Sequence, residues 1–208
     1  DIAFYGGEAG GGKTYALLLE PLYDVHNPDF GAVIFRRTTK QVMSEGGLWD
    51  TASDLYGSLG AKPNLNDLRW TFPSGAKVTF AHMEHEKNRL DWQGSQIPLI
   101  EFDELTHFTW KQFSYMMSRN RSTSGAQSRM RGTLNPDADH WVRQFIDWWI
   151  GEDGYAIPER SGVIRWFIVR DDEVIWAGSR AALQLEYPGC LPKSFTFIRS
   201  SVYDNPAL

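Results

Sequence analysis

A glycine-rich stretch near the start of the chain has the residue types and spacing of a phosphate-binding loop. Four residues separate Gly7 from Gly12, and Lys13 and Thr14 follow, which satisfies G-x-x-x-x-G-K-[ST]. Glycine lets successive N–H groups point inward at oxyanions, the lysine reaches the β- and γ-phosphates, and the hydroxyl ligates Mg²⁺. We therefore expect ATP and Mg²⁺ to bind at Gly7, Glu8, Ala9, Gly10, Gly11, Gly12, Lys13 and Thr14.

The flanks of this loop agree with that interpretation. Residues 2–5 form a short apolar run typical of a buried strand, and residues 14–25 have a helical pattern that Pro21 ends or kinks. A helix that begins at the loop turns its positive end toward the same anions. The alternative, a glycine-rich turn that binds nothing, explains neither the complete motif nor its flanks.

An acidic pair supplies the other half of a hydrolytic site. The segment LIEFDE ends a predicted strand over residues 97–105 with Asp103, which would hold Mg²⁺ through its water shell, and Glu104, which would polarise the attacking water. The alternative is that the pair caps a helix over residues 105–117. Glu101 shares the strand face of Asp103. We expect it to support the site or line the cleft, and a metal role for it stays open.

A water-activating glutamate distinguishes ATP hydrolysis from phosphate transfer to a small molecule, because a small-molecule kinase does not need one. Glu104 therefore favours hydrolysis, and hydrolysis favours a motor or a switch. The segment TLNP follows the next predicted strand, so Thr133 and Asn135 are candidates for sensing the γ-phosphate and reporting its loss to moving parts.

Composition narrows the remaining classes. The 208 residues, 42% of them hydrophobic, suit one large domain, and no apolar run approaches the roughly 20 residues that cross a bilayer. The single cysteine, Cys190, excludes an internal disulfide framework and a cysteine-rich zinc site, and suits the cytoplasm. The pattern His82-x-x-His85 with two glutamates suggests a polar loop rather than a metal site.

Net charge is −5, so no global positive field points to nucleic acid. One stretch differs, because between Leu105 and Pro136 there are five cations and no acid: Lys111, Arg119, Arg121, Arg129 and Arg131. This stretch is either a solvated, arginine-rich loop or a surface aimed at phosphates.

Strand-like runs alternate with helical ones along the chain, which predicts an α/β fold with a mainly parallel sheet flanked by helices. Residues 32–37, 130–136 and 193–201 are further strands, and residues 38–59 read as a helix in two pieces broken at Gly46-Gly47. Residues 68–83 and 162–178 read as hairpins, the second turning at Asp171-Asp172. Residues 138–150 read as an amphipathic helix whose aromatic stripe belongs to the core.

Six segments occur in the order expected of bacteriophage terminase large subunits: GEAGGGKT, FRRT, GGLWD, LIEFDELTHF, SRNRS and TLNP. The sequence resembles that family over nearly the whole chain. The phosphate-loop and acidic motifs belong to many ATPases, whereas FRRT and the R-x-R-S…NP elements are more specific.

The resemblance implies a RecA-like P-loop NTPase in which an additional strand beside the phosphate loop's strand places the catalytic glutamate next to the γ-phosphate. It assigns Lys13 and Thr14 to the Walker A motif, Asp103 and Glu104 to the Walker B pair, and residues 133–136 to the coupling motif. Family members often carry an arginine inside the phosphate loop. No arginine lies there in this sequence, so we expect a neighbouring subunit to supply one, with Arg89, Arg119 and Arg121 as candidates that otherwise bind DNA phosphates or solvate a loop.

The resemblance also implies partners and a context. They are double-stranded DNA, the procapsid with its portal, and the small terminase subunit, in the cytoplasm of an infected bacterium and without a membrane. The chain would be a monomer alone and a homo-oligomeric ring on the procapsid. We expect residues 1–208 to be a single ATPase domain, a fragment without the adenine-contacting segment, the nuclease domain or nuclease activity.

Three other functions remain open at this stage. A helicase or other DNA translocase of the relevant type needs two such domains, whereas this chain holds one. A nucleotide-dependent switch or clamp with negligible turnover is disfavoured by Glu104. A phosphotransferase would need an acceptor pocket or lid, and no segment resembles one.

Overall fold

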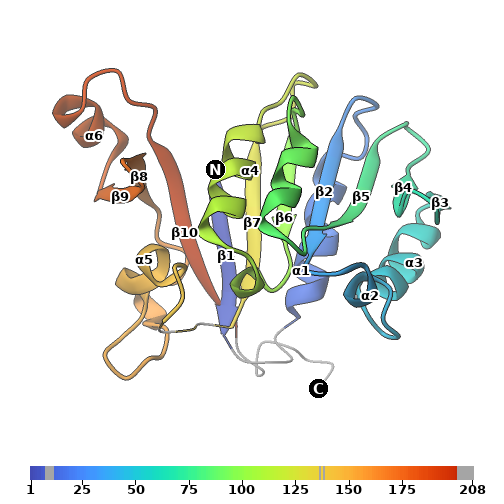
Figure 1. The fold of residues 1–208 in the computed structure, drawn as a ribbon, viewed down its shortest axis with the longest axis horizontal. Helices are drawn as coiled ribbons and strands as arrows, with labels where there is room; N and C mark the ends of the chain where they lie inside the picture. Colours follow the sequence, from blue (N-terminus) through green and yellow to red (C-terminus); the bar gives the residue numbers. More distant parts are fainter. Residues whose placement is uncertain (8–11, 136, 138, 201–208) are drawn as a thin grey trace.

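The computed structural model describes residues 1–7, 12–135, 137 and 139–200. These residues form one ten-stranded sheet in the order β3-β4-β5-β2-β6-β7-β1-β10-β8-β9 (Figure 1). The strands are β1 Ile2–Gly7, β2 Gly31–Arg36, β3 Lys62–Asn64, β4 Arg69–Thr71, β5 Lys77–His82, β6 Leu99–Phe102, β7 Arg129–Leu134, β8 Arg165–Arg170, β9 Glu173–Ala177 and β10 Lys193–Ser200.

The six central strands are parallel, as predicted. β1 pairs with β7 and β10, β6 pairs with β7 and β2, and β2 pairs with β5, each in parallel. Antiparallel strands close both ends of the sheet. β7 separates β1 from β6, so the sheet has the additional strand that the resemblance implies, directly beside the strand that leads into the phosphate loop. The carboxyl ends of these parallel strands lie along one edge of the sheet, the lower edge in Figure 1.

Short helices connect the strands. The α-helices are α1 Lys13–Leu19, α2 Thr39–Val42, α3 Leu48–Ser58, α4 Trp110–Arg119, α5 Arg143–Ile146 and α6 Arg180–Glu186. The 3₁₀ helices are η1 Glu20–Tyr23, η2 Glu86–Trp92, η3 Leu105–His107, η4 Asp147–Trp149 and η5 Pro158–Arg160. Among the described residues, no helix has both the length and the apolar character needed to cross a membrane.

Two hydrophobic cores lie on opposite faces of the sheet. In β6, Leu99 packs with α1 and α3, whereas Ile100 and Phe102 pack with α4, because alternate side chains of a strand point to opposite faces. In Figure 1, α4 covers the front of the sheet and α1 lies behind it. The loops that carry the site leave the sheet between these two layers.

Most predicted elements are present, and the first helix is interrupted at Pro21 as expected. Pro21 changes α1 into the 3₁₀ helix η1, because proline cannot donate the next helical hydrogen bond. Both hairpins form, and Asp171 and Asp172 have φ angles of 51° and 62° in the second turn. The prediction of one helix over residues 138–150 is wrong, because helical structure there is limited to α5 and η4. The sequence analysis also missed β3 and α6.

Candidate functional site

Three adjacent strands bring the predicted site residues together. β1 ends at Gly7, β7 at Leu134 and β6 at Phe102, and their order places these carboxyl ends side by side. Gly7 has φ 141°, and a Cβ there would lie 2.1 Å from the carbonyl oxygen of Ser200 on β10. Glycine is therefore required where the chain leaves β1. Glu8, Ala9, Gly10 and Gly11 lie outside the described residues, and Gly12, with φ 74°, precedes α1.

Lys13 links the start of α1 to the end of β7. Its Nζ donates hydrogen bonds to Asn135 Oδ1 at 2.6 Å and to the carbonyl oxygen of Gly7 at 3.3 Å. Burial lowers the pKa of Lys13, while the negative charges of Glu104 and Asp103 act in the opposite direction. The ammonium therefore lies within electrostatic reach of both acids that the sequence analysis singled out. Thr14, in the first turn of α1, is half-buried.

Thr133 joins the acidic pair to β7. Its hydroxyl donates to Asp103 Oδ1 at 2.6 Å and accepts the backbone N–H of Glu104 at 3.1 Å. Thr133 is 1% exposed and Asp103 is 3% exposed. The hydroxyl thus fixes the Asp103 carboxylate and the backbone of Glu104 together.

Glu104 has a backbone conformation that is unusual for a residue with a side chain. Its φ and ψ are 55° and 62°, in the left-handed region. It does not cap a helix through its side chain, and α4 begins later, capped by Thr109, whose hydroxyl accepts the N–H of Gln112. The helix-cap alternative is therefore wrong. Among the described residues, no hydrogen bond reaches the Glu104 carboxylate, which leaves it available to a water molecule.

Arg36 is a site residue that the sequence analysis missed. It is the last residue of β2, and its Nε lies 2.8 Å from Asp103 Oδ2. The FRRT motif contained this residue, but no local signal connected it to an acid 67 positions later (103 − 36). The contact exists because β2 pairs with β6, whose next residue is Asp103.

Glu101 lies inside the protein and not on the rim of the site. Its side chain is fully buried, and neither carboxylate oxygen has a hydrogen-bond partner among the described residues. Burial raises the pKa of Glu101 well above its ordinary value, Glu20 raises it further, and Arg131 and Arg129 act in the opposite direction. Full burial and the raised pKa disfavour the charged form that a metal ligand needs, so this position does not suit the metal role left open above.

The described oxygen ligands fit Mg²⁺ that arrives with a nucleotide. Mg²⁺ prefers oxygen and usually takes one or two carboxylates together with substrate phosphates and water. Asp103, Glu104 and Thr14 offer such oxygens, whereas no cluster of three or more His, Cys, Asp or Glu side chains within the described residues could hold a metal alone. His82 instead contacts the Thr39 hydroxyl through Nδ1 at 3.0 Å.

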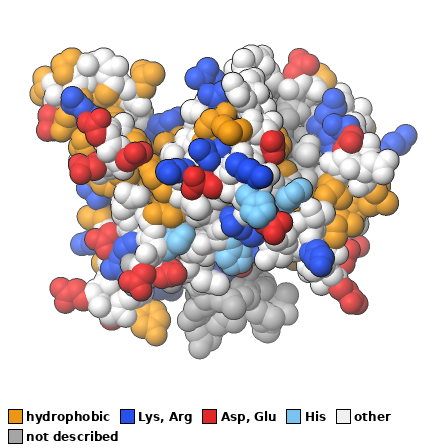
Figure 2. Space-filling model, viewed as in Figure 1, with side chains coloured by type: hydrophobic (Ala, Val, Ile, Leu, Met, Phe, Trp, Pro, Cys, Tyr) orange, Lys and Arg blue, Asp and Glu red, His pale blue; other side chains and the backbone are white. Residues whose placement is uncertain are grey.

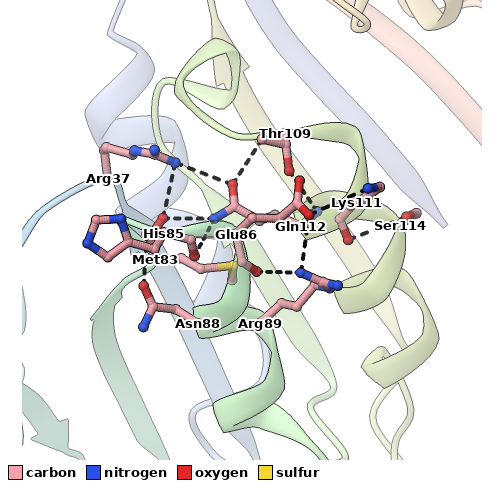
Figure 3. A network of polar contacts seen from close by, with 10 residues as sticks. All are labelled: Arg37, Met83, His85, Glu86, Asn88, Arg89, Thr109, Lys111, Gln112 and Ser114. Carbon is pink, nitrogen blue, oxygen red and sulfur yellow. Dashed lines mark hydrogen bonds and ion pairs between the residues drawn. The ribbon is translucent and has the colours of Figure 1, made fainter.

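Arg89 lies in η2, which packs against α4 through a polar network (Figure 3). Its guanidinium donates to the carbonyl oxygen of Glu86 at 2.7 Å and lies 3.5 Å from the Glu86 carboxylate. Gln112 of α4 donates to the carbonyl oxygens of Met83 and His85, which lead into η2. Arg89 is thus held on the side of the molecule where β5 ends and α4 begins.

Arg119 and Arg121 lie at the opposite edge of the sheet. α4 has ten residues and so runs about 15 Å away from the acidic pair. At its end, the carbonyl oxygen of Arg119 accepts the N–H of Ile97, and Asn120 donates to the carbonyl oxygens of Ile97 and Pro98, just before β6. Within one chain, these two arginines are remote from Glu104.

Arg129 and Arg131 are structural, so both interpretations of the acid-free stretch are wrong for them. Arg129 pairs with Glu20 and Asp24 at 2.6 Å each, and Arg131 pairs with Glu20 at 2.8 Å. These ion pairs fasten η1 to β7. On the face shown in Figure 2, acidic and basic side chains are interspersed and do not form a field of one sign.

A sequence profile of one protein family matches almost the whole chain. The sequence profile described as "Terminase large subunit, T4likevirus-type, N-terminal" matches residues 4–207. A search of curated proteins gave no match.

Several solved structures share the fold. The large terminase of a thermophilic bacteriophage superposes with a TM-score of 0.61 at 14% identity, over 100% of this chain and 42% of that one. A structure of the same phage's large terminase in complex with ADP gives a TM-score of 0.58 at 12% identity, with coverage of 100% and 42%. The N-terminal domain of the DNA packaging ATPase from bacteriophage phi29 gives 0.52 at 13% identity, over 84% of this chain and 88% of that one. This chain thus spans 42% of the length of the thermophilic phage's large terminase.

Proposed function

The chain belongs to the family of terminase large subunits of the T4likevirus type, and on that premise we propose that it is an ATP-hydrolysing motor domain that drives double-stranded DNA into a procapsid. The observation that carries the proposal is the meeting of Lys13, Asp103, Glu104 and Thr133 at the carboxyl ends of adjacent strands. A lysine, a metal-holding carboxylate and a water-activating carboxylate are the groups that phosphoryl transfer to water requires.

We propose the following roles at this site. The phosphate loop from Gly7 to Gly12 and the Lys13 ammonium bind the β- and γ-phosphates of ATP. Thr14 and Asp103 hold Mg²⁺, which neutralises charge on the phosphates when it is bound. Glu104 accepts the proton of the attacking water, for which its open carboxylate is suited.

Thr133 and Asn135 are proposed to couple hydrolysis to movement. Asn135 accepts a hydrogen bond from Lys13, and Thr133 binds both Asp103 and the backbone of Glu104. Thr133 of β7 and Asn135, the residue after β7, therefore contact both halves of the site. Loss of the γ-phosphate changes the position of Lys13. The hydrogen bond from Lys13 to Asn135 then transmits this change to the end of β7.

A neighbouring subunit is proposed to complete the site with an arginine. Negative charge that develops on the γ-phosphate needs a cation besides Lys13. Of the three candidates, Arg89 is favoured because it lies on the side where α4 begins, whereas Arg119 and Arg121 lie at the opposite edge. The chain would then be monomeric and slow alone, and active as a ring on the procapsid portal.

We further propose that the small terminase subunit and double-stranded DNA are partners, and that the chain works in the cytoplasm of an infected bacterium. The face shown in Figure 2 mixes acidic and basic side chains, so that face offers no continuous positive surface for tight, sequence-independent binding. Nuclease activity is not expected, because such chemistry needs several carboxylates converging on metals. Plasmid cleavage that is lost when acids beyond Asn135 are changed would overturn that expectation.

Phosphate release is the decisive assay. The purified chain would be given Mg²⁺ and ATP alone, with double-stranded DNA, and with DNA and procapsids. We expect slow release alone, faster release in the full assembly, and none from Lys13→Ala or Glu104→Gln. The chain could instead bind ATP tightly and release no more phosphate than the Glu104→Gln variant under any of these conditions. That result would identify a nucleotide-dependent switch.

A further inference from the structure

Arg36 has no part in the function proposed so far, although it contacts the centre of the site. Arg36 and Arg37 are consecutive, so their side chains lie on opposite faces of the sheet. Arg36 pairs with Asp103 at 2.8 Å. Arg37 instead donates to the carbonyl oxygen of Met83 and to Gln112 Oε1 on the α4 side (Figure 3). Of these two neighbouring arginines, only Arg36 contacts the carboxylate of Asp103, which is proposed to hold the metal.

Each oxygen of the Asp103 carboxylate has one neighbouring side chain. Oδ1 accepts the Thr133 hydroxyl at 2.6 Å, and Oδ2 faces Arg36 Nε. The Asp103 side chain is 4% exposed and that of Arg36 is 22% exposed, so solvent screens this contact less than a surface ion pair. A cation that approaches Asp103 therefore meets a carboxylate that already has a positive guanidinium beside Oδ2.

The charges of four described residues around Asp103 add to zero. Lys13 and Arg36 each contribute one positive charge, and Asp103 and Glu104 each contribute one negative charge. A divalent cation gains little electrostatic energy from such a neutral set, and the described residues offer no cluster of acids that would hold it alone. A nucleotide triphosphate changes the balance, because it adds several negative charges beside Lys13.

We propose that Arg36 is a positioning residue that keeps divalent cations from binding at Asp103 until nucleotide phosphates are present, so that metal and nucleotide enter together. The inference rests on the proposed role of Asp103 as the metal-holding carboxylate. A purely structural role for Arg36 would be to hold β2 against β6. Those strands are already paired from Ala32↔Leu99 to Phe35↔Phe102, so the ion pair is not needed to align them.

The test measures metal binding without nucleotide. Mn²⁺ would stand in for Mg²⁺, and free Mn²⁺ would be followed by electron paramagnetic resonance while the full chain is titrated. We expect the wild-type chain to bind Mn²⁺ weakly. The Arg36→Gln chain should bind Mn²⁺ at least about tenfold more tightly than the wild type. That gain is the size expected when one positive charge a few ångströms from a divalent cation is removed, even with water-like screening.

Three variants make the result specific. Arg36→Lys keeps the charge and should bind Mn²⁺ as weakly as the wild type. Arg37→Gln removes the neighbouring guanidinium, which does not touch Asp103, and should also leave binding unchanged. The double change Arg36→Gln with Asp103→Asn should abolish the gain, which places the metal at Asp103. Thermal unfolding of each variant establishes that it is folded.

Two results would overturn the proposal. One is equal Mn²⁺ affinity for the wild type and a folded Arg36→Gln chain. The other needs no arginine variant: tight Mn²⁺ binding to the nucleotide-free wild type that disappears in Asp103→Asn would show that Arg36 does not exclude metal. Neither readout depends on turnover, so failure here is distinct from failure of ATP hydrolysis.

Discussion

The Thr133 hydroxyl donates a 2.6 Å hydrogen bond to Asp103 Oδ1 across the boundary between β7 and β6. The oxygen of the Thr133 hydroxyl also accepts the N–H of Glu104. One side chain on the additional strand therefore positions both members of the acidic pair. Removal of the Thr133 hydroxyl changes no charged group. Its effect on activity therefore measures how much the positions of Asp103 and Glu104 matter, apart from their charges.

We expect Thr133→Val to lower kcat by about tenfold to a hundredfold, because a hydrogen bond to a charged group contributes about 1.5–3 kcal/mol. ATP affinity should change little, since Lys13 is intact. Steady-state phosphate release and nucleotide binding give the two values. Thr133→Ser should retain activity, and Thr196→Val, which loses an exposed contact with Val163, serves as the matched control. Full activity in Thr133→Val would argue against this positioning role.

Glu104 should show a conflict between stability and activity. Glu104→Gly relieves the left-handed conformation, which costs a residue with a side chain about 1–2 kcal/mol, whereas Glu104→Gln keeps it. We expect both variants to bind ATP without hydrolysing it, and the glycine variant alone to melt at a higher temperature than the wild type. Calorimetry on the pair distinguishes the two effects. A glycine variant no more stable than the glutamine variant would show that the conformation carries no strain.

Glu101 should make the folded state less stable as pH rises. Its folded pKa lies well above the unfolded value of 4.5, so the folded chain keeps a proton that the unfolded chain releases. The stabilising contribution is complete below pH 4.5 and is lost as pH rises toward the folded pKa. Glu101→Gln removes this ionisation. We therefore expect the wild-type free energy of unfolding to fall more than that of the variant between about pH 5 and pH 8.

Urea denaturation across that range measures the difference, with the exposed Glu45→Gln as control. Parallel pH profiles for the wild type and Glu101→Gln would mean that the buried carboxyl is already ionised in the folded chain. They would also reopen a charged role for it.

Arg89→Ala is expected to lower turnover in the assembled motor by about 10³-fold or more, as for other arginines supplied in trans. Mixed rings of Arg89→Ala and Glu104→Gln should recover turnover. In them, an intact arginine from one subunit meets an intact glutamate in the next. Parallel mixtures with Arg119→Ala and Arg121→Ala should show no such complementation, because those residues lie at the opposite edge. Recovery with either of them, and not with Arg89→Ala, would reverse the assignment.

The sequence by itself determined the local chemistry. Gly7 to Thr14 have the spacing of a phosphate loop, and Asp103 and Glu104 follow an apolar run. Asp171 and Asp172 are residues that favour turns, and they predicted the turn of the second hairpin. Such features depend on the φ preferences and chemical groups of neighbouring residues, so they can be read within a window of about ten positions. The β-hairpins and the parallel strands followed from the same local periodicity.

The tertiary structure decided which distant residues meet. The placement of β7 between β1 and β6 brings Thr133 to Asp103, and the pairing of β2 with β6 brings Arg36 to the same carboxylate. Glu101 is buried because β6 is covered on both faces. α4 begins at Trp110 because the hydroxyl of Thr109, and not the acidic pair, caps it by accepting the N–H of Gln112. Strand order depends on pairing between segments tens of residues apart. The free energy of that pairing comes from the packed cores, and no local pattern records it.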